Sequence, residues 1–192
     1  MGMGSGREVS SEELLGPLNE LERKYAPNRV FLPGPMPLPL PHPRVAVIGT
    51  RTPSEEGLAM ASHLARPLAR QGAIVVSGLA RGIDTAAHLA AMEASGKTIA
   101  VLGTPLTEVY PRENANLQKR IMESFLAVSQ FAEDQPTRPR NFVLRDRTMA
   151  LIADASVIVE SGDGGGRCTR VGKRCDWDAH CSFMPGSLRS RI

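Results

Sequence analysis

Two glycine-containing segments carry residue types that suit the binding of an anion. The first reads Gly49-Thr50-Arg51, and the second runs from Ser77 to Asp84 as Ser-Gly-Leu-Ala-Arg-Gly-Ile-Asp. Glycines let backbone amides come close to an anion, and arginines add charge-assisted hydrogen bonds that suit phosphate. The alternative is a pair of tight turns whose arginines pair with nearby acids. The predicted phosphate contacts in these segments are Gly49, Thr50, Arg51, Ser77, Gly78, Arg81 and Gly82.

Other titratable residues give no sign of catalysis or metal binding. Asp84 falls where a helix is expected to begin, so its carboxylate is predicted to cap the first turn. His88 is predicted to pack on a helix face, because no nucleophile lies beside it in the sequence. His42 and His63 are isolated and the cysteines lack C-x-x-C spacing, so no metal site is expected. The dinucleotide fingerprint G-x-G-x-x-G is also missing, and no cofactor is expected.

The elements that must position these residues follow from the hydrophobic pattern. Short apolar runs occur at residues 45–48, 73–76, 98–102, 125–128 and 156–159, with helical periods at 54–70, 84–94, 114–123 and 143–153. Strands without polar alternation, each separated by a helix, are typical of a parallel sheet with helices on both faces. The sequence therefore predicts an α/β, Rossmann-like fold. In such a fold the loops that follow the strands gather at one edge, where ligands bind.

Composition shifts divide the chain into three predicted regions. Residues 1–43 form an N-terminal extension, with a mobile start, one short helix over 11–25 capped by Ser11, and a linker in which proline alternates with other residues. Residues 44–166 form the Rossmann-like domain. Residues 167–192 form an atypical tail, expected to be disordered or poorly packed.

The net charge of +3 is concentrated in that tail, so it does not by itself predict a nucleic-acid partner for the main domain. Six basic and two acidic residues lie in 167–192, which leaves the remainder with a charge of −1. No apolar run approaches the roughly 20 residues that a membrane helix needs, and no secretion signal opens the chain. We expect a cytoplasmic protein without a membrane partner.

Taken in order, these motifs resemble the DNA-processing protein A family, which is also called DprA or Smf. The resemblance runs from about Tyr25 to Glu160. The segments that carry it are residues 45–51, 75–88, 96–104 and 110–114, and Asn141-Phe142 followed by Arg145 and Arg147. It implies a single-stranded DNA binder, not an enzyme, that hands DNA to the RecA recombinase during natural transformation. It also implies an extended Rossmann-like domain that typically forms a homodimer.

The resemblance implies further site residues beyond the first loop. They are Arg112, Asn141, Phe142, Arg145 and Arg147. Arginines on such loops would neutralise backbone phosphates, and an exposed Phe142 would stack on a base, although a core aromatic is the alternative for Phe142. Thr50 replaces the family's more usual Ser and keeps the hydroxyl. Asp146 stands where the family commonly has Asn, and we expect its carboxylate to weaken DNA binding or to alter its geometry.

The tail departs from the family, which predicts a sheet that is incomplete at its C-terminal end. One permitted set of codons for residues 168–183, read two nucleotides later, encodes an amphipathic helix followed by an apolar strand, as the fold requires. We therefore hypothesise a frameshift near Gly166.

Two alternative functions remain open at this point. One is a nucleotide phosphoribohydrolase of the LOG type, whose Pro-Gly-Gly-x-Gly-Thr-x-x-Glu motif is met only by the glycines of residues 162–166. The other is an inactive, truncated remnant.

Overall fold

The computed structural model describes residues 6–161 and 184–185. The strands are β1 Arg7–Val9, β2 Val30–Leu32, β3 Arg44–Ile48, β4 Ile74–Ser77, β5 Thr98–Leu102, β6 Leu126–Ser129, β7 Ala155–Ile158 and β8 Met184–Pro185. The helices are α1 Ser11–Leu15, α2 Glu20–Tyr25, α3 Glu55–Arg70, α4 Ile83–Glu93, α5 Ala115–Ser124 and α6 Pro139–Ile152, with a 3-10 turn, η1, at Arg112–Asn114. In the part of the chain that is described, no helix is long and apolar enough to cross a membrane.

The described strands form one sheet in the order β1-β2-β6-β5-β4-β3-β7-β8. The five strands from β6 to β7 in that order are parallel to one another, whereas the β1-β2, β2-β6 and β7-β8 pairs are antiparallel. The chain steps outward from β3 to β6 and then returns to β7 on the other side of β3. This reversal is a topological switch point, and ligands of open α/β sheets bind beyond the carboxyl ends of the strands at such a point.

The two faces of the sheet bury different layers. Parallel β-α-β crossovers are right-handed, so the direction in which the chain steps across the sheet decides which face each helix covers. The steps from β3 to β6 place α3, α4 and α5 on one face, and the step back from β6 to β7 places α6 on the other. Accordingly, Met149 and Ile152 of α6 share a core with strand residues and with the N-terminal segment. On the opposite face, Ala61, Ala65 and Ala69 follow one side of α3 and share a second core with α4. These small side chains let α3 and α4 approach closely.

The predicted α/β, Rossmann-like fold class is confirmed, and its central strands and helices lie close to their predicted positions. The largest difference is α6, which begins at Pro139 rather than at Val143. Proline is well suited to the first turn of a helix, because its fixed φ is already helical and no partner for its nitrogen is needed. Asn141 and Phe142 therefore lie on the helix itself and not on the loop before it.

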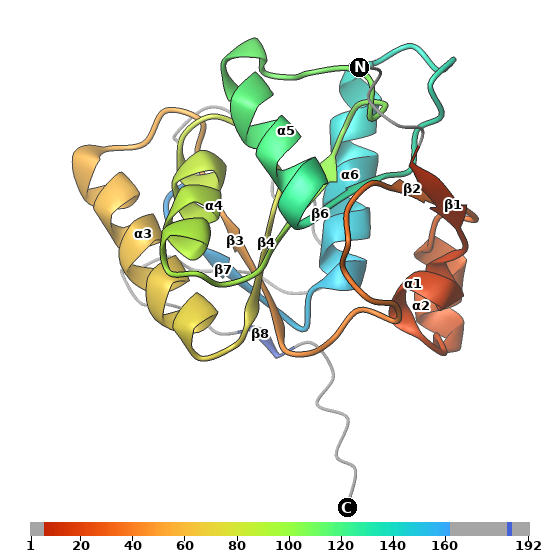
Figure 1. Cartoon of the computed structure of the whole chain (residues 1–192), viewed down its shortest axis with the longest axis horizontal. Coiled ribbons are helices and arrows are strands. Elements are labelled where there is room, and N and C mark those ends of the chain that lie inside the picture. Colours follow the sequence, from red (N-terminus) through yellow and green to blue (C-terminus); the bar gives the residue numbers. More distant parts are fainter. Residues whose placement is uncertain (1–5, 162–183, 186–192) are drawn as a thin grey trace, which may run out of the picture.

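The N-terminal region differs from its prediction in three respects. The helix expected over 11–25 is two helices, α1 and α2, separated at Gly16 and Pro17, and the N-cap of α1 is Ser10 rather than Ser11. Residues 7–9, expected to be mobile, form β1. This strand pairs with β2, which in turn pairs with β6 and so extends the sheet. Figure 1 shows these red and orange elements gathered at one end of the molecule, beyond β6.

The proline-rich segment contains neither helix nor strand, and it packs against the fold. Met36 and Leu40 are buried in the core that α6 covers. The backbone amide of Leu40 donates to the carbonyl of Leu14 at 2.8 Å. The division of the chain at residue 43 stays a prediction.

Candidate nucleic-acid interface

Hydrogen bonds join the loops at the carboxyl ends of the strands into one continuous edge. The Thr50 amide donates to the Glu160 carbonyl at 2.8 Å, which connects the loops after β3 and β7 across the switch point. The Asn114 side-chain amide donates to the Leu79 carbonyl at 2.9 Å and connects η1 to the loop after β4. We call this edge the rim and define it as residues 49–54, 78–82, 103–114 and 138–147.

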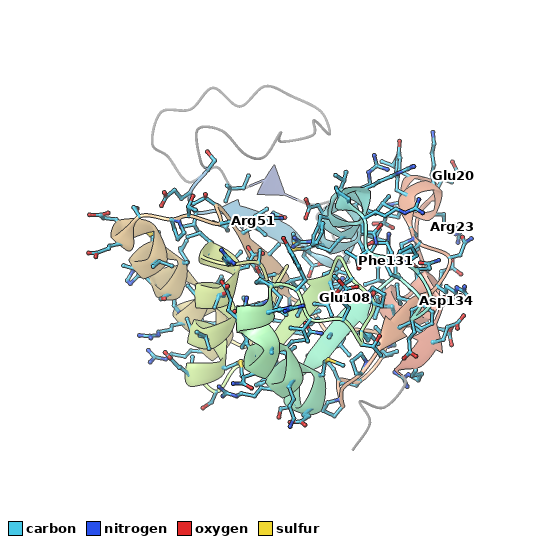
Figure 2. The ribbon with its side chains drawn as sticks, turned by 90° about the horizontal axis from the view of Figure 1, so that it is seen from above. Glu20, Arg23, Arg51, Glu108, Phe131 and Asp134 are labelled. Atoms are coloured by element: carbon cyan, nitrogen blue, oxygen red, sulfur yellow. The ribbon has the colours of Figure 1, made fainter. Side chains whose placement is uncertain are left out.

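The centre of the rim is an aromatic pair with an arginine beside it. The rings of Tyr110 and Phe142 lie 5.1 Å apart and are tilted by 51°. The Arg51 guanidinium carbon lies 5.7 Å from the centroid of the Phe142 ring, within the range of a cation–π interaction. Phe142 is half-buried, and Tyr110 is 48% exposed. The rim thus brings an open aromatic surface next to an exposed cation. That cation is Arg51, which Figure 2 labels.

Gly103 makes room for this arrangement. A Cβ atom built at Gly103 would lie only 2.6 Å from Cδ1 of Phe142, so the ring occupies the space that a side chain would need. Phe142 is therefore a rim residue supported from below by the end of β5, rather than a residue of the central core. Phe142 was predicted from the sequence, but its ring partner was not. Tyr110 was visible there only as part of a family motif.

Arg145 is not an exposed cation. Its side chain is 6% exposed, and its NH1 nitrogen lies 3.7 Å from Oδ2 of Asp84, which is also 6% exposed. A Cβ atom on Gly78 would lie 1.2 Å from that nitrogen, so the lack of a side chain at Gly78 makes room for the guanidinium. Burial raises the pKa of Asp84, and the charge of Arg145 together with a hydrogen bond from the Ala80 amide opposes the rise. The geometry assigns Arg145 to holding α6 against the loop after β4, and not to direct phosphate contact.

The prediction that Asp84 caps α4 is wrong. The N-cap is Gly82, without a side-chain cap, and Asp84 is the second residue of the helix. Its carboxylate accepts from the Ala80 amide at 3.2 Å, outside the helix, and so fixes the loop instead. Negative charge is still favourable at this helix end. The spacing of the motif located the carboxylate correctly but did not reveal its partners.

The glycines of the rim serve close packing between protein segments. A side chain at Gly49 would meet Ile83 and the Glu160 carbonyl, and one at Gly82, where φ is +76°, would meet Pro53 and the Thr50 carbonyl. These spaces are filled by the protein itself. The predicted approach of backbone amides to phosphate through Gly49, Gly78 and Gly82 therefore has no support in this geometry, and any role of these glycines toward DNA stays a prediction.

A carboxylate also occupies the start of α3. The Glu160 side chain accepts hydrogen bonds from the Ser54 hydroxyl at 2.9 Å and from the Ser54 amide at 3.2 Å. Ser54 in turn caps the Gly57 amide. Because the Glu160 carboxylate occupies the start of α3, arginine side chains rather than this helix end are the groups left there to meet an external anion.

Ser77 and Asn141 are both buried. The Ser77 hydroxyl has no exposed surface and donates to the Val47 carbonyl at 2.7 Å, which argues against its predicted contact with phosphate. Asn141 is 8% exposed in the first turn of α6. Thr50 is better placed, because it is half-buried and its hydroxyl oxygen accepts from the Thr52 amide at 3.3 Å. The Thr50 hydroxyl proton stays available to donate.

Several exposed arginines lie on the rim. Arg81 pairs with Glu113 at 2.6 Å, an exposed pair that contributes little to stability and that a phosphate can replace. Within residues 6–161, Arg51, Arg112 and Arg147 have no ion pair. The same holds for Arg138 and Arg140 at the start of α6, which were not predicted from the sequence. The Thr-Arg-Pro-Arg run directly before Asn141 was the available signal.

Asp146 adds one negative charge to this surface. Its Oδ1 lies 3.2 Å from Nε of Arg145, and its side chain is 60% exposed. Protein packed around the carboxylate raises its pKa, while the charges of Arg145 and Arg51 act in the opposite direction. Arg51 lies beside the Phe142 ring, and its charge also acts to lower the pKa of Asp146.

Fold and rim together define a Rossmann-like α/β protein whose carboxyl-end edge carries exposed arginines and an aromatic pair. The sequence model of the DNA recombination-mediator protein A family matches residues 13–191, and the chain belongs to this family. The match includes the tail, beyond the segment from 25 to 160 that the motifs had indicated.

Individual relatives agree with this assignment. The chain is 28% identical over 169 residues to DNA processing protein DprA of Bacillus subtilis, covering 88% of this chain and 57% of the relative. It is 34% identical over 146 residues to the Streptococcus pneumoniae protein, covering 76% of this chain and 51% of the relative. The chain thus spans little more than half the length of these two curated relatives.

Two solved structures resemble the fold. The X-ray structure of DprA from Streptococcus pneumoniae matches with a TM-score of 0.68 and 30% identity, covering 80% of this chain and 53% of that one. A structure of DNA processing protein A from Helicobacter pylori, described for its single-stranded DNA binding mode, matches with a TM-score of 0.65 and 25% identity. It covers 84% of this chain and 71% of that one.

Proposed function

We propose that this protein binds single-stranded DNA along the rim and takes part in DNA uptake and recombination. The observation that carries the proposal is the Arg51-Phe142-Tyr110 cluster at the switch point of the sheet. Aromatic rings stack on unpaired bases whatever their sequence, and nearby arginines neutralise the phosphates between those bases. A duplex keeps its bases stacked inside, so this surface favours a single strand.

The binding residues of this proposal form two groups. Phe142 and Tyr110 stack on bases, and Thr50 donates to a phosphate oxygen. The phosphate contacts are Arg51, Arg81, Arg112, Arg138, Arg140 and Arg147. Arg145 and Asp84 position α6 beneath them and do not touch the DNA.

We propose binding rather than catalysis as the activity. The two buried titratable groups behind the rim are not placed to serve as acid or base, because Asp84 pairs with Arg145 and His88 is fully buried. A phosphoribohydrolase of the LOG type is less well supported, because the motif residues that follow its glycines are missing from this sequence.

The wider role rests on family membership. We propose that the protein passes bound DNA to a RecA recombinase, acts as a homodimer and works in the cytoplasm, where both DNA and recombinase are present. We also keep the frameshift near Gly166 as a proposal, although it concerns residues that lie outside the described part of the chain. Resequencing of the gene together with the mass of the purified protein tests it, and an intact present reading frame would contradict it.

Titration of the full chain with matched single-stranded and duplex oligonucleotides tests the binding proposal. We expect tighter binding of the single strand, and we expect Phe142→Leu to reduce this preference. Equal binding of both forms, abolished only by deletion of residues 167–192, would assign the affinity to the basic tail. Release of free base from a nucleoside monophosphate would support the enzyme instead.

A further inference from the structure

One acidic side chain lies on a surface whose other charged groups suit phosphate. Asp146 follows Phe142 by four residues on α6, so both side chains lie on the same face of the helix, one turn apart. Its carboxylate is 60% exposed, in contrast to the 6% exposure of its neighbour Arg145. Asp146 therefore lies on the same face of α6 as Phe142 and is open to solvent.

Within residues 6–161 the carboxylate oxygens of Asp146 accept no hydrogen bond. Oδ1 forms an ion pair with Nε of Arg145 at 3.2 Å, but that nitrogen donates no hydrogen bond to it, so both oxygens keep their capacity to accept one. A phosphate is a poor neighbour for this group, because both are negative and both only accept hydrogen bonds. The chemistry of the site calls for a ligand that presents N–H donors next to an aromatic ring.

An unpaired nucleobase stacked on the aromatic pair meets that description. In a single strand the Watson–Crick edge is open, and a base that stacks on Phe142 or Tyr110 turns this edge toward the surrounding side chains. Guanine presents two adjacent donors, N1–H and the N2 amino group, which match the two oxygens of a carboxylate. Cytosine and adenine present one amino group each, and the single imino group of thymine lies between two carbonyl oxygens that a carboxylate repels.

We propose that Asp146 reads the base that stacks at Phe142 and gives this protein a preference for guanine at that position of the strand. The inference rests on the proposed single-strand binding along the rim and adds base selectivity to it. Arg51 and the other exposed arginines hold the backbone irrespective of sequence, so only the base beside Asp146 is selected. Cytosine and adenine are bound with intermediate affinity, and thymine is bound least well.

Four thymine 12-mers that carry guanine, cytosine, adenine or thymine at the central position test this inference. Their dissociation constants are measured for the full-length protein at one salt concentration. A bidentate carboxylate contact is worth about 1–3 kcal/mol of discrimination, so we expect about tenfold tighter binding of the guanine 12-mer than of the all-thymine 12-mer. Asp146→Ala is expected to bind all four within about twofold of one another, since it removes both acceptor oxygens.

Asp134→Ala is the matched control for loss of one exposed negative charge. Asp134 lies on the loop before α6, and Figure 2 shows it away from Arg51, on the side of the N-terminal elements. This variant is expected to keep the guanine preference. Equal binding of the four 12-mers by the unmodified protein, or a guanine preference that persists in Asp146→Ala, would overturn the inference and leave single-strand binding intact. Binding of none of them would overturn single-strand binding as well.

Discussion

The Arg145 guanidinium and the Asp84 carboxylate form a buried ion pair with 3.7 Å between NH1 and Oδ2. The pair joins α6 to α4 beneath the rim. Because α6 also carries Phe142 and Asp146, the pair fixes the position of the groups proposed to meet a base. An arginine that sequence motifs assign to DNA contact thus supports the site from inside.

We expect Arg145→Met to destabilise the fold by about 3–5 kcal/mol, because it leaves the Asp84 carboxylate buried without its counter-charge. Urea unfolding of the purified variant measures this loss. Adding Asp84→Asn to Arg145→Met is expected to recover part of the stability. The matched control is Arg147→Met, two residues along the same helix, where an exposed side chain should cost under about 0.5 kcal/mol. Similar losses for both single variants would contradict the buried-pair interpretation.

His88 predicts a dependence of stability on pH. Its Nδ1 lies 2.7 Å from the Thr98 hydroxyl oxygen. Because the Thr98 hydroxyl donates its own proton to the Val75 carbonyl, Nδ1 carries a proton and donates it to the Thr98 oxygen. Burial, with the charge of Arg145 as a second cause, lowers the pKa of His88 from 6.5 to about 3. Between pH 6.5 and 3 the folded state therefore binds fewer protons than the unfolded state. The contribution of His88 to the free energy of unfolding is fully present above about pH 6.5 and is lost as the pH falls toward 3.

Below pH 6.5 the free energy of unfolding is expected to change by up to about 1.4 kcal/mol per pH unit because of His88. Urea unfolding of the protein and of His88→Gln at pH 7 and pH 5 measures it, since glutamine does not titrate. The difference in stability between the two proteins should shrink at pH 5. His63→Gln, on the exposed side of α3, is the control and should keep the slope of the unmodified protein. An unchanged difference for His88→Gln at the two pH values would refute this assignment.

Gly103→Ala is expected to reduce single-strand affinity with little loss of stability. The added methyl group meets the edge of the Phe142 ring at 2.6 Å, and this half-buried ring can pivot away more easily than backbone can. Base stacking is worth about 1–3 kcal/mol, so the loss of a well-placed ring corresponds to roughly fivefold weaker binding or more. Fluorescence anisotropy for affinity and urea unfolding for stability separate the two effects. A large fall in stability with unchanged affinity would argue against the role given to Phe142.

The sequence was sufficient for the parallel strands, because each is a short, mostly apolar run between helical segments. β4, β5 and β6 are buried on both faces, whereas β7 is half-buried to exposed. The sequence was insufficient for β1 and β2, which are three residues each and depend on pairing with β6, a contact distant in sequence. The same limit applies to the site. Spacing identified the loop that carries Arg51, but only the fold reveals that Arg145 turns inward and that Glu160 reaches the start of α3.

The central claim is that the exposed arginines of the rim hold the backbone of single-stranded DNA, and the salt dependence of Arg51→Ala tests it most directly. The matched control is Arg70→Ala, an exposed arginine in the last turn of α3 and so at the opposite edge of the sheet. Each lost phosphate contact lowers the slope of log K against log salt by about 0.7 for a single strand. We predict this decrease, with weaker binding, for Arg51→Ala and no change for Arg70→Ala. Equal slopes for Arg51→Ala and the unmodified protein, or equal losses in both variants, would contradict the account.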